Sequence, residues 1–383
     1  MIMHHSYAEF IPAKQSYLIL KMSIDITHHI NGLMEVIYMN KKSTIIGFII
    51  FVLMIIGFFT IKNLTETKNG KINMYTALNL QLDKILNPKS TNEQSIEEIR
   101  ERLNKESIKS SKPPIPFSNI KNITLEVNSE KIPVRIYTPE GGDMFPIIIY
   151  SHGGSWIAGN LDTHDNVCRN LSQNTTAIVI SVDYRLSPEN PFPAGLNDVY
   201  NVLQWTYKNA KNINGNKSHI AVVGDSAGGN LSAAVCLMAK DKNGPYITCQ
   251  VLIYPSTNIY ELNTQSWSDF SNDFNISKEE MEKYISLYVP QKEDRKNPYV
   301  SPLLAKEFNQ LPDALVITAE IDPLKDDGEA YGTKLKEKGI QSEVIRFNGV
   351  THGFITMDKI TNKADEALNQ ISSFLKIEFQ KQR

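Results

Sequence analysis

The feature that most constrains the fold is a repeated alternation of short apolar runs with longer helical stretches. The run at 146–150 (PIIIY) is apolar throughout, as expected for a strand buried on both faces. Later runs of the same kind are AIVISV, HIAVVG, CQVLIY and ALVITA, with helical patterns between them. Strands that alternate with helices form a mostly parallel sheet flanked by helices. We therefore predict an α/β fold whose ligand site lies at the carboxyl ends of the strands.

Composition fits one large globular domain with appendages and excludes several classes of function. Of 383 residues, 41% are hydrophobic, and the formal net charge is -2, so no basic footprint for nucleic acid is present. Cys168, Cys236 and Cys249 are too few for a disulfide framework and match no zinc spacing. The histidine pairs at 4–5 and 28–29 have no carboxylate or cysteine ligands around them. We expect neither a metal nor a cofactor.

An apolar run at 44–61 (TIIGFIIFVLMIIGFFTI) has no charge and is flanked by lysines. It is just long enough to cross a bilayer and shows no polar stripe. No small-residue cleavage pattern follows it. We therefore predict a retained transmembrane anchor, with the N-terminus in the cytoplasm and the catalytic domain on the extracytoplasmic side. Residues 1–43 are read as a leader, and the basic start at Met39 suggests that translation begins there.

Two segments are predicted to cover the site. Residues 71–117 read as an N-terminal helical cap, in which Ser95 and Glu98 have capping-box spacing and the prolines after Lys112 end the helices. The catalytic domain is predicted over 118–383. Within it, the aromatic-rich stretch at about 255–300 either forms a second cap element that lines the pocket or merely covers the sheet.

The strongest chemical signal is a serine with a glycine two positions away on either side. The strand HIAVVG runs into Gly224-Asp225-Ser226-Ala227-Gly228-Gly229, and a helical pattern follows. A strand, a sharp turn and a helix in this order form a nucleophile elbow, whose close backbone approach leaves no room for a Cβ at the flanking glycines. Ser226 is therefore the predicted nucleophile.

A serine hydroxyl needs a base, and the base needs an orienting carboxylate. Asp322 follows the strand ALVITAE, and His352 follows EVIRFNG, so both fall beyond strand ends on the same edge as Ser226. We predict that His352 is the general base and that Asp322 orients it.

The oxyanion of the reaction needs hydrogen-bond donors. The segment His152-Gly153-Gly154-Ser155-Trp156 follows a central strand and is rich in small residues. We expect the amides of Gly153, Gly154 and Ala227 to form the oxyanion hole. The candidate substrate-pocket residues are Ser155, Trp156 and Asp225.

These motifs resemble the hormone-sensitive-lipase-like family of α/β hydrolases, which includes bacterial esterases and arylacetamide deacetylase. The resemblance covers Ser118 to the C-terminus and rests on HGGSW, DYRLSPENPFPA, GDSAGGN, AEIDPLKDDGEAY and THGF. It implies the same triad and oxyanion residues, a capping role for the helices before the domain, and a small-molecule ester substrate. The family's usual third glycine is Ser155 here, which bears on the acyl group admitted.

The leading hypothesis is a serine carboxylic ester hydrolase that acts on short- to medium-chain acyl esters through an acyl-enzyme. An amidase or deacetylase would use the same triad. A non-catalytic small-molecule receptor of this fold would lack a triad member, whereas all three positions are filled here. A further hypothesis, that the protein is mainly a membrane-tethered interaction module, is supported only by the predicted helices at 71–112. The oligomeric state does not follow from the sequence.

Overall fold

The computed structural model describes residues 25, 27–28, 41–67, 70–78, 94–271 and 276–381. The chain divides into two compact units, Met1–Asn63 and Leu64–Arg383. Most of what is described of the first unit belongs to helix α2 (Lys41–Thr65). The predicted leader and the predicted start at Met39 lie outside the described residues, apart from a few positions.

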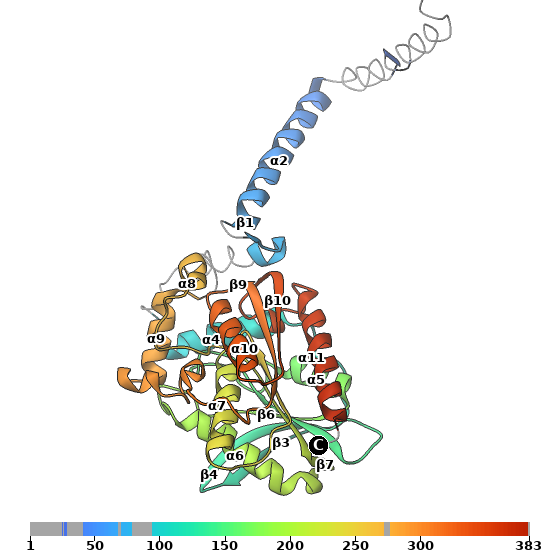
Figure 1. Cartoon of the computed structure of the whole chain (residues 1–383). Coiled ribbons are helices and arrows are strands. Elements are labelled where there is room, and N and C mark those ends of the chain that lie inside the picture. The colour runs from blue at the N-terminus through green and yellow to red at the C-terminus, as the bar shows by residue number, and fades with distance from the viewer. Residues whose placement is uncertain are drawn as a thin grey trace, which may run out of the picture. The chain divides into compact units, whose positions relative to one another are not determined.

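An eight-stranded sheet forms the centre of the second unit (Figure 1). Its spatial order is β10-β9-β8-β7-β5-β6-β4-β3. Neighbours from β10 to β6 pair in parallel, whereas β4 is antiparallel to both β6 and β3. The strands are β3 (Ile120–Val127), β4 (Glu130–Tyr137), β5 (Phe145–Ser151), β6 (Ile178–Val182), β7 (Gly215–Asp225), β8 (Cys249–Ile253), β9 (Asp313–Ile321) and β10 (Ser342–Thr351). The predicted α/β fold with a mostly parallel sheet is confirmed.

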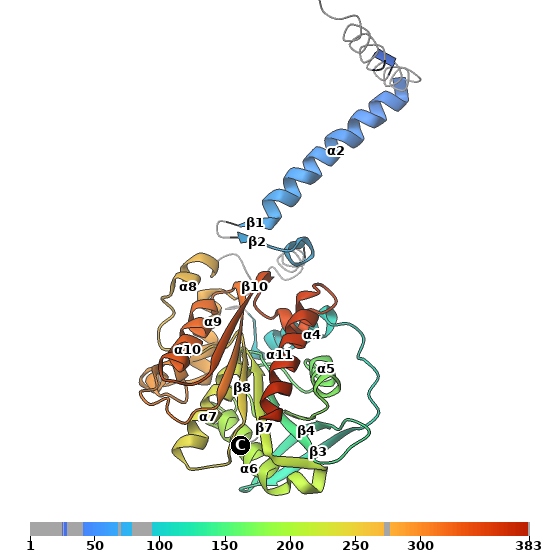
Figure 2. The same cartoon turned by 45° about the vertical axis from the view of Figure 1, so that its right-hand side comes forward.

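Helices cover both faces of the sheet (Figure 2). One face packs against α6 (Ala194–Asn209), α7 (Ala227–Asp241) and α10 (Lys325–Glu337), and the other against α5 (Asp165–Thr175) and α11 (Lys363–Gln380). The strands β5, β6 and β8 and the second half of β7 (220–225) are almost wholly buried because both of their faces are covered. This burial explains why these strands read as continuous apolar runs instead of alternating ones.

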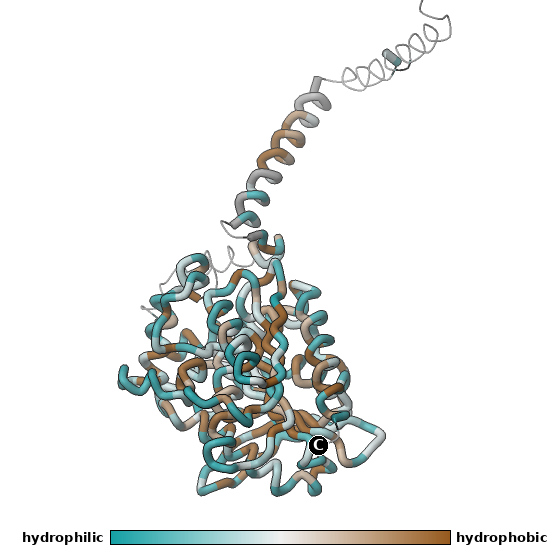
Figure 3. Tube along the Cα trace, viewed as in Figure 1, coloured by the Kyte–Doolittle hydropathy of each residue, from teal (hydrophilic) through white to brown (hydrophobic). Residues whose placement is uncertain are grey.

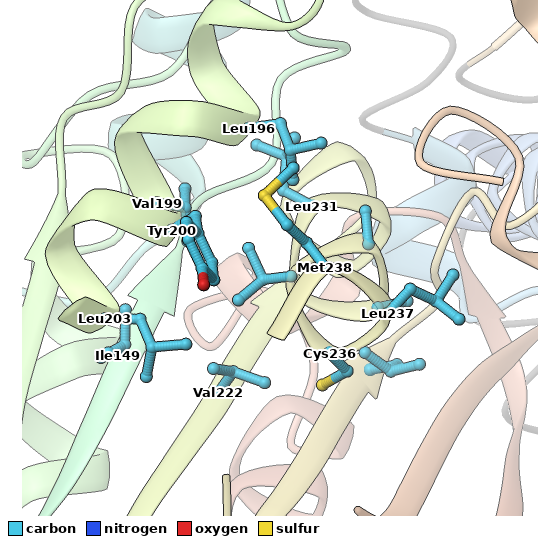
Figure 4. Packing of buried hydrophobic residues seen from close by; sticks show 14 of the residues in the cluster. Ile149, Leu196, Val199, Tyr200, Leu203, Val222, Leu231, Cys236, Leu237 and Met238 are labelled. Atoms are coloured by element: carbon cyan, nitrogen blue, oxygen red, sulfur yellow. The ribbon is translucent and has the colours of Figure 1, made fainter. Parts of the chain in front are cut away.

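The first core cluster joins β5 and β7 to the helices above them (Figure 4). Ile149 and Val222 lie beneath Leu203 of α6 and Leu231 of α7, and all four side chains are fully buried. Hydrophobic residues follow the central strands, as the colouring of the chain in Figure 3 shows. All three cysteines are buried and free, as predicted.

The predicted capping box is present at the start of helix α4 (Ile96–Ser110). The Ser95 amide donates to the Glu98 carboxylate at 2.8 Å, and the Glu98 amide donates to Ser95 Oγ at 3.2 Å. A short helical turn at 74–78 precedes it. Residues 79–93 of the predicted cap lie outside the described part of the chain.

The aromatic-rich stretch at 255–300 contains α8 (Gln265–Phe270), α9 (Lys278–Tyr288) and the short η3 (Lys292–Lys296). Its aromatic side chains divide between the two expected roles. Trp267 and Tyr288 belong to the main core cluster, whereas Tyr284 lines the large cavity described below. Phe274 lies outside the described residues.

The prediction of a transmembrane anchor at 44–61 is wrong, and with it the extracytoplasmic placement of the catalytic domain. No helix among the described residues is long and apolar enough to cross a membrane.

The central packing predicts a sharp contrast between two isoleucines. Replacing the fully buried Ile149 by alanine should lower the free energy of unfolding by about 2–5 kcal/mol, because a cavity remains among packed neighbours. Ile377→Ala on α11, where the side chain is 60% exposed, is the matched control and should change it by about 0.5 kcal/mol or less. Urea unfolding measures both, and equal losses would contradict this packing.

Candidate active site

Ser226 lies in a sharp turn between β7 and α7, with φ of 55° and ψ of -118°. This backbone conformation is unusual for a residue with a side chain and costs about 1–3 kcal/mol. The Ser226 amide donates to the carbonyl of Ile253 at 2.8 Å, which ties the turn to the adjacent strand β8. A Cβ on Gly228 would overlap the backbone carbonyl of Ser151. The elbow therefore depends on close approach between the start of α7 and the end of β5.

The three predicted triad side chains come together in one chain of hydrogen bonds. Asp322 immediately follows β9, and His352 immediately follows β10. His352 Nδ1 lies 2.8 Å from Asp322 Oδ2, and His352 Nε2 lies 2.8 Å from Ser226 Oγ. An ionised carboxylate only accepts, so Nδ1–H donates to Asp322, and Nε2 is left to accept the Ser226 hydroxyl proton.

The Asp322 carboxylate is held on its other side as well. It is fully buried, and its Oδ1 accepts the amide of Leu324 at 2.9 Å. Two acceptor oxygens with two donors leave this carboxylate little freedom to rotate. The His352 ring is kept in place by Tyr254, whose ring centroid lies 4.7 Å away.

The predicted oxyanion loop follows β5 and has an unusual backbone. Gly154 has φ of +124°, and a Cβ there would overlap the carbonyl of Ala158. Ser155 and Trp156 also have positive φ, at 54° and 61°. The Gly153 amide donates to Asp225 Oδ1 at 3.0 Å, so this N–H is already occupied by a carboxylate. Of the three predicted oxyanion donors, Gly153 is therefore engaged elsewhere.

Asp225, next to the serine, is buried and hydrogen-bonded on several sides. Tyr150 O–H donates to its Oδ1 at 2.8 Å, and His164 Nε2 lies 3.1 Å from the same oxygen. Burial alone would raise the pKa of Asp225, but the attraction and hydrogen bond of His164, together with Tyr150, hold the pKa below its usual value. The carboxylate therefore stays ionised inside the protein.

His152 directly precedes the loop glycines and is fully buried against Tyr184. The two rings stack at 4.3 Å, and Tyr184 O–H donates to the His152 carbonyl at 2.8 Å. Burial, with repulsion from His164, lowers the pKa of His152 to about 4. His152 is therefore neutral at pH 7 and supports the loop without carrying a charge.

A cavity of about 880 Å³ opens over Ser226. Ser226, His352, Gly153, Gly154, Ser155 and Asp225 line its floor. Helix α4 contributes Leu103, α9 contributes Tyr284, and the segment before α4 contributes Thr76. This volume is within the usual range for small-molecule sites, about 300–1,000 Å³.

Two of the three predicted pocket residues, Ser155 and Asp225, line the cavity. Trp156 instead packs in the main core cluster, where it stacks on Tyr288 at 4.5 Å with the rings nearly parallel.

Sequence reasoning missed His164 and Tyr254, because a single histidine in a turn and a tyrosine after a strand have no diagnostic spacing. Among the described residues, no group of three or more histidine, cysteine or acidic side chains could hold a metal ion.

A mostly parallel sheet with a serine elbow, a histidine and a carboxylate at its strand ends defines the class of α/β hydrolases. A family model described as the alpha/beta hydrolase fold matches residues 148–356. The chain belongs to this family, and the resemblance to its hormone-sensitive-lipase-like members is confirmed.

Several curated relatives and solved structures with similar sequences are named as esterases. The carboxylic ester hydrolase LipN of Mycobacterium tuberculosis is 36% identical over 67% of this chain and 70% of its own length. An arylesterase of Saccharolobus solfataricus is 36% identical over 68% of this chain and 84% of that protein. The structure of an esterase from Pyrobaculum calidifontis has a TM-score of 0.73 and 37% identity, and covers 78% of this chain and 97% of that one.

The buried Asp327, in the first turn of α10, predicts that the free energy of unfolding depends on pH. Burial raises the pKa of Asp327 to about 8, with further contributions from Asp326 and Asp322. The Asp327 carboxyl binds its proton more tightly in the folded state than in the unfolded chain. The resulting gain in the free energy of unfolding is therefore complete below about pH 4 and is lost as the pH rises through about 8. Asp327→Asn should therefore raise the unfolding midpoint at pH 8 more than at pH 5.

Thermal unfolding of Asp327→Asn and wild type at the two pH values measures this difference. Replacement of the exposed Asp143 by asparagine is the matched control. A gain of the same size at pH 5 and pH 8 would contradict the assignment of the buried proton to Asp327.

Proposed function

We propose that this chain, a serine carboxylic ester hydrolase, cleaves short- to medium-chain acyl esters through an acyl-enzyme on Ser226. The observation that carries the proposal is the continuous hydrogen-bond chain from Asp322 through His352 to Ser226, at the floor of a cavity. The names of the relatives support an ester as substrate. No observation favours an amide substrate, and the filled triad positions argue against a receptor.

The first half of the reaction uses His352 as general base. Ser226 Oγ attacks the ester carbonyl carbon while His352 Nε2 takes the hydroxyl proton. Asp322 stabilises the imidazolium that forms. His352 then donates this proton to the leaving alcohol, and the acyl group remains on Ser226. In the second half, water attacks the acyl carbon with the same base, and the carboxylic acid and free Ser226 are released.

The tetrahedral intermediates carry a negative oxygen that needs donors. We propose that the amides of Gly154, Ser155 and Ala227 supply them. Gly154 and Ser155 line the cavity beside Ser226, and Ala227 begins α7, whose N-terminus favours negative charge. Gly153 is left out of this set because its amide donates to Asp225.

Residues 71–117, with the stretch at 255–300, are proposed to form a cap that closes the acyl side of the cavity. Leu103 of α4 and Ile276 and Tyr284 around α9 supply apolar wall. Arg100 fastens α4 to the catalytic domain. It donates to the carbonyl of Ile157 at 2.7 Å and to the carbonyl of Ser187 at 2.9 Å.

The triad predicts a steep loss of turnover on substitution. Ser226→Ala should lower kcat for p-nitrophenyl butyrate by about 10⁴-fold or more, because no other hydroxyl can form the acyl-enzyme. Asp322→Asn should also lower kcat strongly, because the favoured histidine tautomer is lost. Ser218→Ala, at an exposed serine on β7 outside the cavity lining, is the matched serine control and should keep wild-type activity. Equal rates for Ser226→Ala and wild type would contradict the proposal.

The cap predicts a change in chain-length preference. Arg100→Ala should loosen α4 and raise KM for longer p-nitrophenyl esters such as octanoate, with a smaller change for acetate. The reason is that only the longer acyl chains reach the wall contributed by α4. Arg346→Ala, at an exposed arginine paired with Glu329, is the control. A uniform change at every chain length would argue against a cap over the acyl pocket.

A further inference from the structure

A second buried histidine–carboxylate pair lies in the same cavity as the triad. His164 precedes α5, is 5% exposed, and lines the cavity with Ser226. Its Nε2 lies 3.1 Å and 3.2 Å from the two Asp225 oxygens, and its Nδ1 lies 2.8 Å from Thr163 Oγ1. Both ring nitrogens therefore have oxygen partners, and the ring is held from both sides.

This pair is not placed to act on the nucleophile. His352 already contacts Ser226 Oγ, and the two His164 nitrogens are hydrogen-bonded to Thr163 and Asp225. A general base needs a free nitrogen within reach of the proton it takes. His164 is therefore better suited to hold another group in place than to move a proton.

The group that Asp225 holds is the oxyanion loop. Its Oδ1 accepts both the Gly153 amide and the Tyr150 hydroxyl, and Tyr254 O–H lies 3.4 Å from its Oδ2. One carboxylate thus connects the end of β5, the loop after it, the start of α5 and the residue after β8. Gly153 directly precedes Gly154 and Ser155, so holding its N–H fixes the point from which the next two amides start.

We propose that Asp225 and His164 form a positioning pair that fixes the oxyanion loop over Ser226. The carboxylate orients the loop through the Gly153 amide, and His164 and Tyr150 prevent the carboxylate from turning away. The inference rests on the proposed function of Ser226. It assigns to Asp225 and His164 a role in transition-state stabilisation without contact with the reacting atoms.

Two substitutions test the pair in the full-length chain. His164→Ala should lower kcat for p-nitrophenyl butyrate by about 10- to 100-fold with little change in KM, since displaced donors stabilise mainly the transition state. His164→Gln should recover part of this loss, because its amide N–H can donate to Asp225. Tyr150→Phe, which removes one O–H donor and keeps the ring, should lower kcat several-fold. If His164→Ala does not fold, Tyr150→Phe still tests whether the position of the Asp225 carboxylate affects kcat.

The decisive readout is inhibition by an alkyl boronic acid, whose tetrahedral adduct on Ser226 places an oxygen where the oxyanion forms. Its Ki should rise by about the same factor as kcat/KM falls, while the Ki of the product carboxylic acid stays constant. A burst titration gives kcat per active site, which separates mispositioning from loss of folded enzyme. His219→Ala and Tyr331→Phe, at a histidine and a buried tyrosine outside the cavity lining, are the matched controls.

A kcat within twofold of wild type in both His164→Ala and Tyr150→Phe would overturn the inference. So would a lower kcat with an unchanged boronic acid Ki. Failure of the proposed function is distinguishable, because wild type itself would then hydrolyse no ester and show no burst.

Discussion

The site depends on the close approach of two backbones, where the start of α7 meets the end of β5. Gly228 permits this contact, since any Cβ there would overlap the Ser151 carbonyl. The contact forces Ser226 into a strained turn and places its hydroxyl above the sheet edge. It also sets the oxyanion loop, which begins directly after Ser151, beside the nucleophile. The hydrogen bond from the Ser226 amide to the Ile253 carbonyl and the dense packing of β5, β7 and α7 stabilise the strained turn.

Two buried carboxylates then hold different parts of the site in place. Asp322 faces the base and Asp225 faces the oxyanion loop, and each is surrounded by donors that compensate for its removal from water. The two histidines they hold have different freedom. His352 leaves its second nitrogen to the nucleophile, whereas His164 is bonded at both nitrogens. Similar residue types thus serve proton transfer in one pair and positioning in the other.

Much of this arrangement could be predicted from the sequence because it follows from local rules. The apolar runs identify the strands, since strands buried on both faces carry few charged residues, and parallel pairing brings Ser226, Asp322 and His352 to one edge. The role of the Gly153 amide could not be predicted, because it depends on the direction of a single N–H. His164 was missed for a similar reason, since its partner Asp225 is distant in sequence. Trp156 was misplaced because it packs in the core against Tyr288, which is distant in sequence.

The central claim is that Ser226 is acylated during turnover. The most direct measurement is a rapid acid quench of the enzyme with p-nitrophenyl acetate, followed by mass spectrometry of the peptides. We predict one acetyl group per burst equivalent, on the peptide segment that contains Ser226, and its loss as the substrate is consumed. Turnover at the wild-type rate with no covalent adduct, or with the acetyl group on another residue, would contradict the account.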